Sequence, residues 1–145
     1  MGIDQLATSA SAWKPLWGDA PPREAEATLQ DIASTLRTPL EDPGLAGGTT
    51  GLALLHAYLE RGRPGAGHGA CASELLDHAI EALGNQVTGP GFYAGFSGIA
   101  WAVDHLRGIG GPDEDANEAI DEALIEFLNV PRWGLDYDLV SGLVG

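Results

Sequence analysis

One short glycine pattern occurs three times in the chain at a constant interval. The copies are residues 48–51 (GTTG), 95–98 (GFSG) and 142–145 (GLVG), and each begins 47 residues after the previous one. An equal interval of this length is typical of an internal repeat, in which one supersecondary unit stacks on the next. We therefore expect a fold built from stacked repeat units.

Two kinds of helix are predicted to alternate along the sequence. Residues 22–37, 70–83 and 113–128 carry apolar side chains at helical spacing on one face and mainly acidic or polar side chains on the other. Residues 48–59 and 95–106 begin at a glycine motif and are apolar on nearly all faces, as expected for a helix buried on most sides. No stretch shows the two-residue period of a half-buried strand. The sequence thus predicts an all-α fold with amphipathic outer helices and apolar inner helices.

The predicted repeat unit contains two helices and cannot bury its own apolar surface, so neighbouring units must pack on one another. Two architectures fit: an open α-solenoid and a closed α/α toroid, which is a double ring of helices. The apolar inner helices favour the toroid, and so do their glycines, because backbones approach closely where no Cβ is present. We predict an incomplete α/α toroid over residues 22–145, preceded by an N-terminal arm over residues 1–21.

The chain is strongly acidic, with 21 acidic and 7 basic residues and a formal charge of −14. Because it offers no basic patch to neutralise phosphates, we expect no nucleic-acid partner and no binding to an anionic membrane. A cationic peptide matches this charge better. No apolar run reaches the ~18 residues of a membrane span, and the first residues lack the basic and apolar segments of a signal peptide. We expect a cytoplasmic protein.

The residues around the three glycine motifs resemble the lanthionine synthetase C-like family, the lanthipeptide cyclases. Residues 45–55 (LAGGTTGLALL) resemble the family's first motif, residues 91–101 (GFYAGFSGIAW) the second and residues 136–145 (DYDLVSGLVG) the third. The resemblance implies a double ring of α-helices. It also implies addition of peptide cysteine thiols to dehydroalanine or dehydrobutyrine, which forms thioether rings. The implied partners are a precursor peptide and a lanthipeptide dehydratase.

The resemblance implies a zinc ion, held by two cysteines and a histidine, that activates the thiol. In the family these ligands follow the third glycine motif, so we expect no cofactor site within these residues and expect the chain to be the N-terminal part of a longer cyclase. The aspartate of the family's Tyr-Asp pair corresponds to Asp138, for which the resemblance implies a catalytic role in proton transfer. Capping of the next helix is the alternative role. Asp136 is predicted to be a cap or solvated.

Three residues close in sequence, His68, Cys71 and His78, have side chains that bind metals. Their spacing does not match the family's ligands, so a buried thiol is the preferred interpretation of Cys71. His56 and His105 both lie near the far end of a predicted inner helix, where the helix dipole favours a cation.

Two aromatic residues, Phe96 and Trp101, lie on the inner helix predicted over residues 95–106. Both are predicted to be core residues, and part of that face is a candidate lining for a peptide cavity.

Three functions stay open. The first is a lanthionine cyclase-like protein, and the second is a non-catalytic helical-repeat module that binds a peptide or a partner synthetase. The third is another toroid enzyme such as a glycosidase, which requires two carboxylates in its cavity; Asp136 and Asp138 are too close in the chain to favour it. We expect the isolated chain to self-associate, because an open part-ring exposes the apolar flanks of its end helices.

Overall fold

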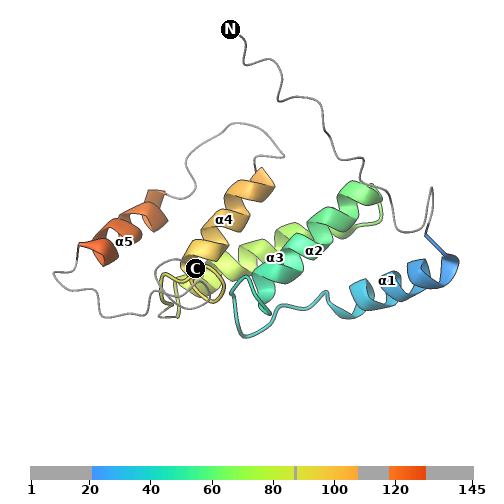
Figure 1. The fold of residues 1–145 in the computed structure, drawn as a ribbon, viewed down its shortest axis with the longest axis horizontal. Helices are drawn as coiled ribbons and strands as arrows, with labels where there is room; N and C mark the ends of the chain where they lie inside the picture. Colours follow the sequence, from blue (N-terminus) through green and yellow to red (C-terminus); the bar gives the residue numbers. More distant parts are fainter. Residues whose placement is uncertain (1–20, 87, 108–117, 130–145) are drawn as a thin grey trace, which may run out of the picture. The chain divides into compact units, whose positions relative to one another are not determined.

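The computed structural model describes residues 21–86, 88–107 and 118–129, which form five helices (Figure 1). The helices are α1 (Arg23–Thr35), α2 (Thr49–Gly62), α3 (His68–Leu83), α4 (Phe96–Arg107) and α5 (Glu118–Leu128). No strand occurs within these described ranges. The predicted all-α fold is confirmed, and the predicted helices are present with ends shifted by a few residues. The first residues predicted for the last helix, 113–117, and the third glycine motif lie outside the described residues.

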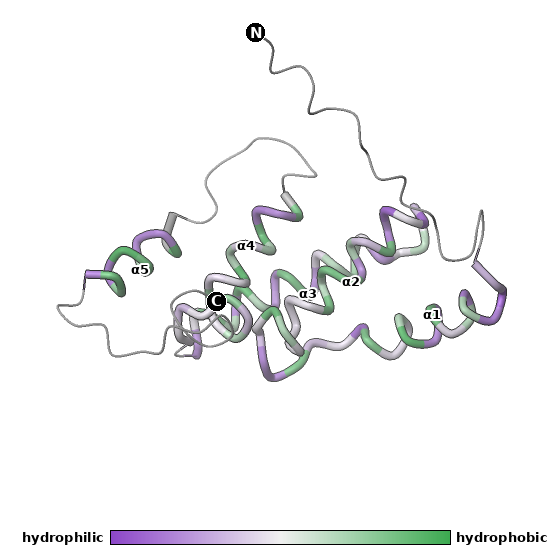
Figure 2. The backbone as a smooth tube through the Cα atoms, viewed as in Figure 1, coloured by the Kyte–Doolittle hydropathy of each residue, from purple (hydrophilic) through white to green (hydrophobic). Residues whose placement is uncertain are grey.

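The chain divides into two compact units, residues 1–34 and residues 35–145. The first unit contains nearly all of α1, along which hydrophobic and hydrophilic residues alternate (Figure 2). On its predicted apolar face Ala33 is buried, whereas Ile32 is largely exposed. The predicted boundary between residues 21 and 22 stays a prediction.

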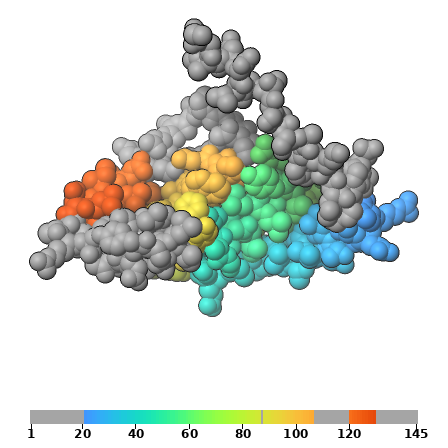
Figure 3. Space-filling model, viewed as in Figure 1, coloured from blue at the N-terminus to red at the C-terminus, as the bar shows by residue number. Residues whose placement is uncertain are grey.

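The second unit is centred on α2 and α3, which pack against each other along their lengths. Ala53 of α2 and Leu75 of α3 are almost wholly buried and, together with Cys71, form an apolar core. Helix α4 contacts both α2 and α3. The space-filling view shows residues from α2 to α4 (green to orange) in continuous contact (Figure 3).

The turn between α2 and α3 is closed by the carboxylate of Glu60. Its Oε1 accepts a hydrogen bond from the Gly65 N–H at 2.6 Å, and its Oε2 accepts one from the Gly69 N–H at 2.9 Å. Gly65 and Gly67 have φ values of 87° and 79°, which favour glycine. Because the N–H groups of a first helical turn have no partner within the helix, Glu60 also caps the start of α3.

The first glycine motif is fixed to the loop that precedes it. The Thr49 N–H donates a hydrogen bond to the Asp42 carbonyl at 2.8 Å, and the Thr50 hydroxyl donates one to the Pro43 carbonyl at 2.6 Å. Thr49 and Thr50 are both fully buried. The loop therefore folds back over the first turn of α2.

The second motif repeats these bonds at positions 47 residues later. The Phe96 N–H donates to the Gly89 carbonyl at 3.0 Å, and the Ser97 hydroxyl donates to the Pro90 carbonyl at 2.5 Å. The sequence repeat is therefore a structural repeat at the level of single hydrogen bonds. We call two residues 47 positions apart counterparts.

The last glycine of each described motif is required because a carbonyl oxygen of the preceding loop lies against the helix at that position. A Cβ on Gly51 would lie 2.5 Å from the Leu45 carbonyl oxygen, and a Cβ on its counterpart Gly98 would overlap the Phe92 carbonyl oxygen. Leu45 and Phe92 are themselves counterparts. The glycines at these positions thus allow a close approach of backbone to backbone.

The buried hydroxyl of Thr50 gives a first testable prediction. Thr50→Val removes the hydrogen bond to Pro43 in a dry environment while conserving side-chain volume, and we expect it to lower the free energy of unfolding by about 1 kcal/mol. Thr28→Val is the matched control, because the Thr28 hydroxyl donates to the Glu24 carbonyl at 2.8 Å from an exposed site. The control is expected to change stability by less than about 0.5 kcal/mol. Urea unfolding followed by circular dichroism measures the free energy of unfolding of both variants. Equal losses of stability in the two variants would contradict a stabilising role of the hydrogen bond from Thr50 to Pro43.

Candidate functional site

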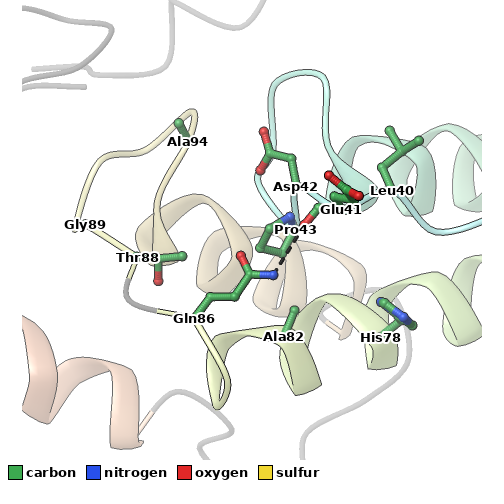
Figure 4. A pocket seen from close by; sticks show the side chains of 10 residues that line it. All are labelled: Leu40, Glu41, Asp42, Pro43, His78, Ala82, Gln86, Thr88, Gly89 and Ala94. Atoms are coloured by element: carbon green, nitrogen blue, oxygen red, sulfur yellow. Dashed lines mark hydrogen bonds between the residues drawn. The ribbon is translucent and has the colours of Figure 1, made fainter.

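A polar hollow of about 680 Å³ lies beside the two described glycine loops (Figure 4). It is bounded by the loop before α2, the last turns of α3 and the loop before α4. The Gln86 amide, which lines the hollow, donates a hydrogen bond to the Glu41 carbonyl at 3.4 Å. The side chains around it are mainly polar or small: Leu40, Glu41, Asp42, Pro43, His78, Ala82, Gln86, Thr88, Gly89 and Ala94.

This hollow forms where one repeat unit meets the next. The Ala46 N–H donates a hydrogen bond to the carbonyl of its own counterpart, Tyr93, at 2.8 Å. Asp42 and its counterpart Gly89 both line the hollow. Consecutive repeats therefore meet through equivalent parts of their glycine loops.

An aromatic row is formed by Tyr58 of α2, His105 and Trp101 of α4, and Phe92 of the loop before α4. The Tyr58 hydroxyl lies 2.6 Å from Nε2 of His105, its counterpart. The His105 ring stacks on Trp101 with centroids 4.7 Å apart and planes 11° apart, and Phe92 contacts Trp101 edge-on at 5.6 Å. The Arg61 guanidinium lies 5.7 Å from the centre of the Tyr58 ring.

Two residues of the row are exposed, whereas His105 and Phe92 are half-buried, and this corrects one prediction. Tyr58 is 51% exposed and Trp101 is 43% exposed, so Trp101 is not a core residue. Phe96 is half-buried. Apolar residues lie on nearly every face of the helix predicted over residues 95–106, so the sequence does not show which face is exposed. In the structure the buried residues of this helix include Ile99, Ala102 and Val103.

The prediction for His56 is also wrong. His56 lies in the middle of α2 rather than in its last turn, and it is fully buried. Its ring contacts His68 and the Leu36 carbonyl. His105 lies in the last turn of α4 as predicted. The interval of 47 residues matches His105 to Tyr58 rather than to His56.

The three residues His68, Cys71 and His78 do not form a common site. His68 is buried against His56, whereas His78 is exposed at the polar hollow. Cys71 is a free, buried cysteine, as predicted, and burial raises the pKa of its thiol. In the part of the chain that the structure describes, no three His, Cys, Asp or Glu side chains are grouped to hold a metal ion.

Residues 39–145 match the sequence model of the lanthionine synthetase C-like proteins. The chain belongs to the lanthionine synthetase C-like family. Its fold class is therefore the α/α toroid of that family, as the repeat predicted. No curated protein matches this lanthionine synthetase C-like chain.

The zinc site that the family implies does not fit the residues of this lanthionine synthetase C-like chain. Such a site takes two cysteines and a histidine, and the 145 residues contain one cysteine, Cys71. A buried thiol with a raised pKa is a poor source of the thiolate that a metal binds. No catalytic step is therefore assigned here to a metal.

The predicted catalytic residue of this lanthionine synthetase C-like chain, Asp138, lies outside the described residues, as does Asp136. Their counterparts are described. A Cβ at Gly91, the counterpart of Asp138, would have no atom within 4 Å, whereas a Cβ at Gly44, two repeats before Asp138, would lie 2.9 Å from Asp42 Oδ1 and 3.2 Å from the Tyr93 carbonyl oxygen. Asp42, two repeats before Asp136, is exposed and accepts a hydrogen bond from the Gly44 N–H at 2.7 Å through Oδ1. A side chain thus has room at Gly91 but not at Gly44, and Asp42 stabilises its own loop.

Among the described residues, none of the helices combines the length and the apolar character that crossing a bilayer requires.

Proposed function

We propose that this lanthionine synthetase C-like protein takes part in lanthipeptide synthesis as a cyclase. Its substrate is a precursor peptide that carries cysteine and dehydroalanine or dehydrobutyrine. The reaction joins the cysteine sulfur to the β-carbon of the dehydro residue and moves the thiol proton to the α-carbon. Atoms and charge balance without a further reactant, and a thioether ring results. A lanthipeptide dehydratase, which makes dehydro residues, is the expected partner.

The match to the family over residues 39–145 carries this proposal. It is supported by the glycine loops, since both described copies place the same backbone and hydroxyl bonds at the start of an inner helix. The matched residues include the third copy, in which Asp138 precedes the glycines.

Asp138 is the residue to which we assign proton transfer. When sulfur adds to the dehydro residue, the electron pair of the double bond moves towards the α-carbon and carbonyl, and that carbon must gain a proton. A positioned carboxyl group supplies general acid–base catalysis for such a transfer.

The test uses the complete product of the reading frame, supplied with zinc, and a model peptide with one cysteine and one dehydroalanine. Ring closure leaves the mass unchanged but removes the free thiol, so alkylation followed by mass spectrometry measures it. We expect the protein to accelerate loss of the alkylatable thiol. A peptide with alanine in place of dehydroalanine is the control and should keep its thiol. No acceleration over buffer would contradict the cyclase proposal.

A second candidate function is a non-catalytic module that binds a peptide. The exposed Tyr58 of α2 and Trp101 of α4 favour it, because exposed aromatic side chains supply contact area for a peptide. Fluorescence anisotropy with the labelled alanine peptide separates the two functions: binding without acceleration of ring closure supports the module.

A further inference from the structure

Two histidines form a buried pair between α2 and α3. His56 is 0% exposed and His68 is 4% exposed, and their Nδ1 atoms lie 2.9 Å apart. The ring centroids are 5.1 Å apart. Neither the glycine loops nor the proposed chemistry uses this pair.

The surroundings of the pair determine where its hydrogens lie. His56 Nε2 is 2.9 Å from the Leu36 carbonyl, which can only accept a hydrogen bond, so His56 Nε2 carries a hydrogen. A neutral imidazole has a single N–H, so His56 Nδ1 accepts. The Nδ1 of His68 must then donate. The result is one chain of hydrogen bonds from His68 through His56 to Leu36.

We propose that His56, His68 and the Leu36 carbonyl form a pH-sensitive latch, which holds the segment before α2 against the α2–α3 pair while both rings are neutral and opens in mild acid. This histidine latch joins three parts of the chain that are separated in sequence. It goes beyond the cyclase proposal and does not depend on it.

Protonation acts on the latch through His68. A proton on His68 Nε2 leaves both hydrogen bonds intact, but it places a charge at a buried site, where the charged ring loses its hydration. Opening the latch returns the charged ring to water, so acid favours the open form.

The surroundings of His68 destabilise its protonated form and lower its pKa. Burial is the main cause that lowers the pKa of His68; the neighbouring His56 ring and the positive charges of Arg37 and Arg63 lower it further, and the Glu60 carboxylate opposes them in part. The Glu60 carboxylate is already engaged with backbone N–H groups of the turn. Cys71, one turn along α3, has a raised thiol pKa and stays neutral.

The direction of the pH effect follows from the lowered pKa. An unfolded chain has a His68 pKa near 6.5, so on acidification it binds a proton before the folded chain does. The stability from a neutral His68 is present above about pH 6.5 and is lost as the pH falls below that value. The loss ends once the pH is below the folded-state pKa. Between the unfolded-state and folded-state pKa values of His68, the unfolding equilibrium constant rises by up to about tenfold for each unit by which the pH falls.

The test compares urea unfolding between about pH 5 and pH 8 for the wild-type chain, His68→Asn and His78→Asn. The asparagine amide N–H replaces Nδ1–H as donor but does not titrate, so His68→Asn is expected to flatten the pH dependence. His78 is exposed on the same helix, and His78→Asn should keep the wild-type slope. Equal slopes in all three proteins would overturn the latch.

A second measurement keeps the proposal testable if His68→Asn does not fold. Long-range ¹H–¹⁵N correlation spectra of the wild-type protein at pH 7.5 should show a hydrogen on Nε2 of His56 and on Nδ1 of His68. Amide exchange around Leu36, corrected for the intrinsic effect of pH, should accelerate on acidification more than exchange in the α2–α3 core. The opposite tautomers, or uniform exchange, would refute the proposed arrangement.

Discussion

Replacing Gly98 by alanine is expected to lower the free energy of unfolding by about 3 kcal/mol or more. The new Cβ would overlap the Phe92 carbonyl oxygen, lie 3.0 Å from the Phe92 carbonyl carbon and lie 3.0 Å from the Leu45 Cβ. Neither neighbour can move freely, since one is backbone and the other belongs to the preceding repeat. The substitution therefore forces apart both the loop from its helix and one repeat from the next.

Gly91→Ala is the control for this prediction, because it makes the same change in the loop of the same repeat. A Cβ at Gly91 would meet no atom within 4 Å. We expect a change within about 0.5 kcal/mol. The direction of the stability change at Gly98 is also informative, because alanine inside a helix is ordinarily about 1 kcal/mol more favourable than glycine. Urea unfolding compares the variants, and a stable Gly98→Ala protein would contradict the described loop geometry.

Replacing Asp138 by asparagine is expected to slow ring closure by about 100- to 10,000-fold, the usual contribution of a general acid–base group. Asparagine has nearly the same shape but cannot supply or accept the proton. It is also about as good a helix N-cap as aspartate, so a capping role at Asp138 would survive the change. The variant therefore separates catalysis from capping. The measurement is the rate of thiol loss from the dehydroalanine peptide.

The matched control is Asp121→Asn, which makes the same change at an exposed aspartate on α5. It is expected to leave the rate of ring closure within twofold of wild type, since surface changes of this kind alter stability by less than about 0.5 kcal/mol. Asp138→Ala is a third variant that removes both possible roles. If Asp138→Asn retains full activity and Asp138→Ala loses stability by about 1 kcal/mol, Asp138 is a cap.

Periodicity predicted the helices because every turn of an amphipathic or buried helix repeats the same apolar signal. It did not predict which face of an apolar helix stays open, and this is why Trp101 was assigned to the core. The exposed face depends on how far the neighbouring repeat covers the helix, and this is determined only when the helices pack together. His56 was assigned to a helix end for a similar reason, since its partners Leu36 and His68 lie 20 and 12 residues away.

The interval of 47 residues was more informative than any single motif. It placed the glycines and would also have matched His105 to Tyr58, whose side chains touch. The reason for the glycines was not visible in the sequence, because the Leu45 and Phe92 carbonyls come near them only after the loops have folded. Asp138, the predicted site residue, could be identified by resemblance alone.

The side-chain hydrogen bond in each described glycine loop can be compared with the sequence of the third repeat, which carries Asp138. In the first two repeats a proline carbonyl accepts from Thr50 or Ser97 seven residues later. In the third repeat the same two positions hold Tyr137 and Val144, and valine has no hydroxyl to donate. The side-chain hydrogen bond that the first two repeats share thus has no hydroxyl donor at the equivalent position of the third repeat, which is the repeat that carries Asp138.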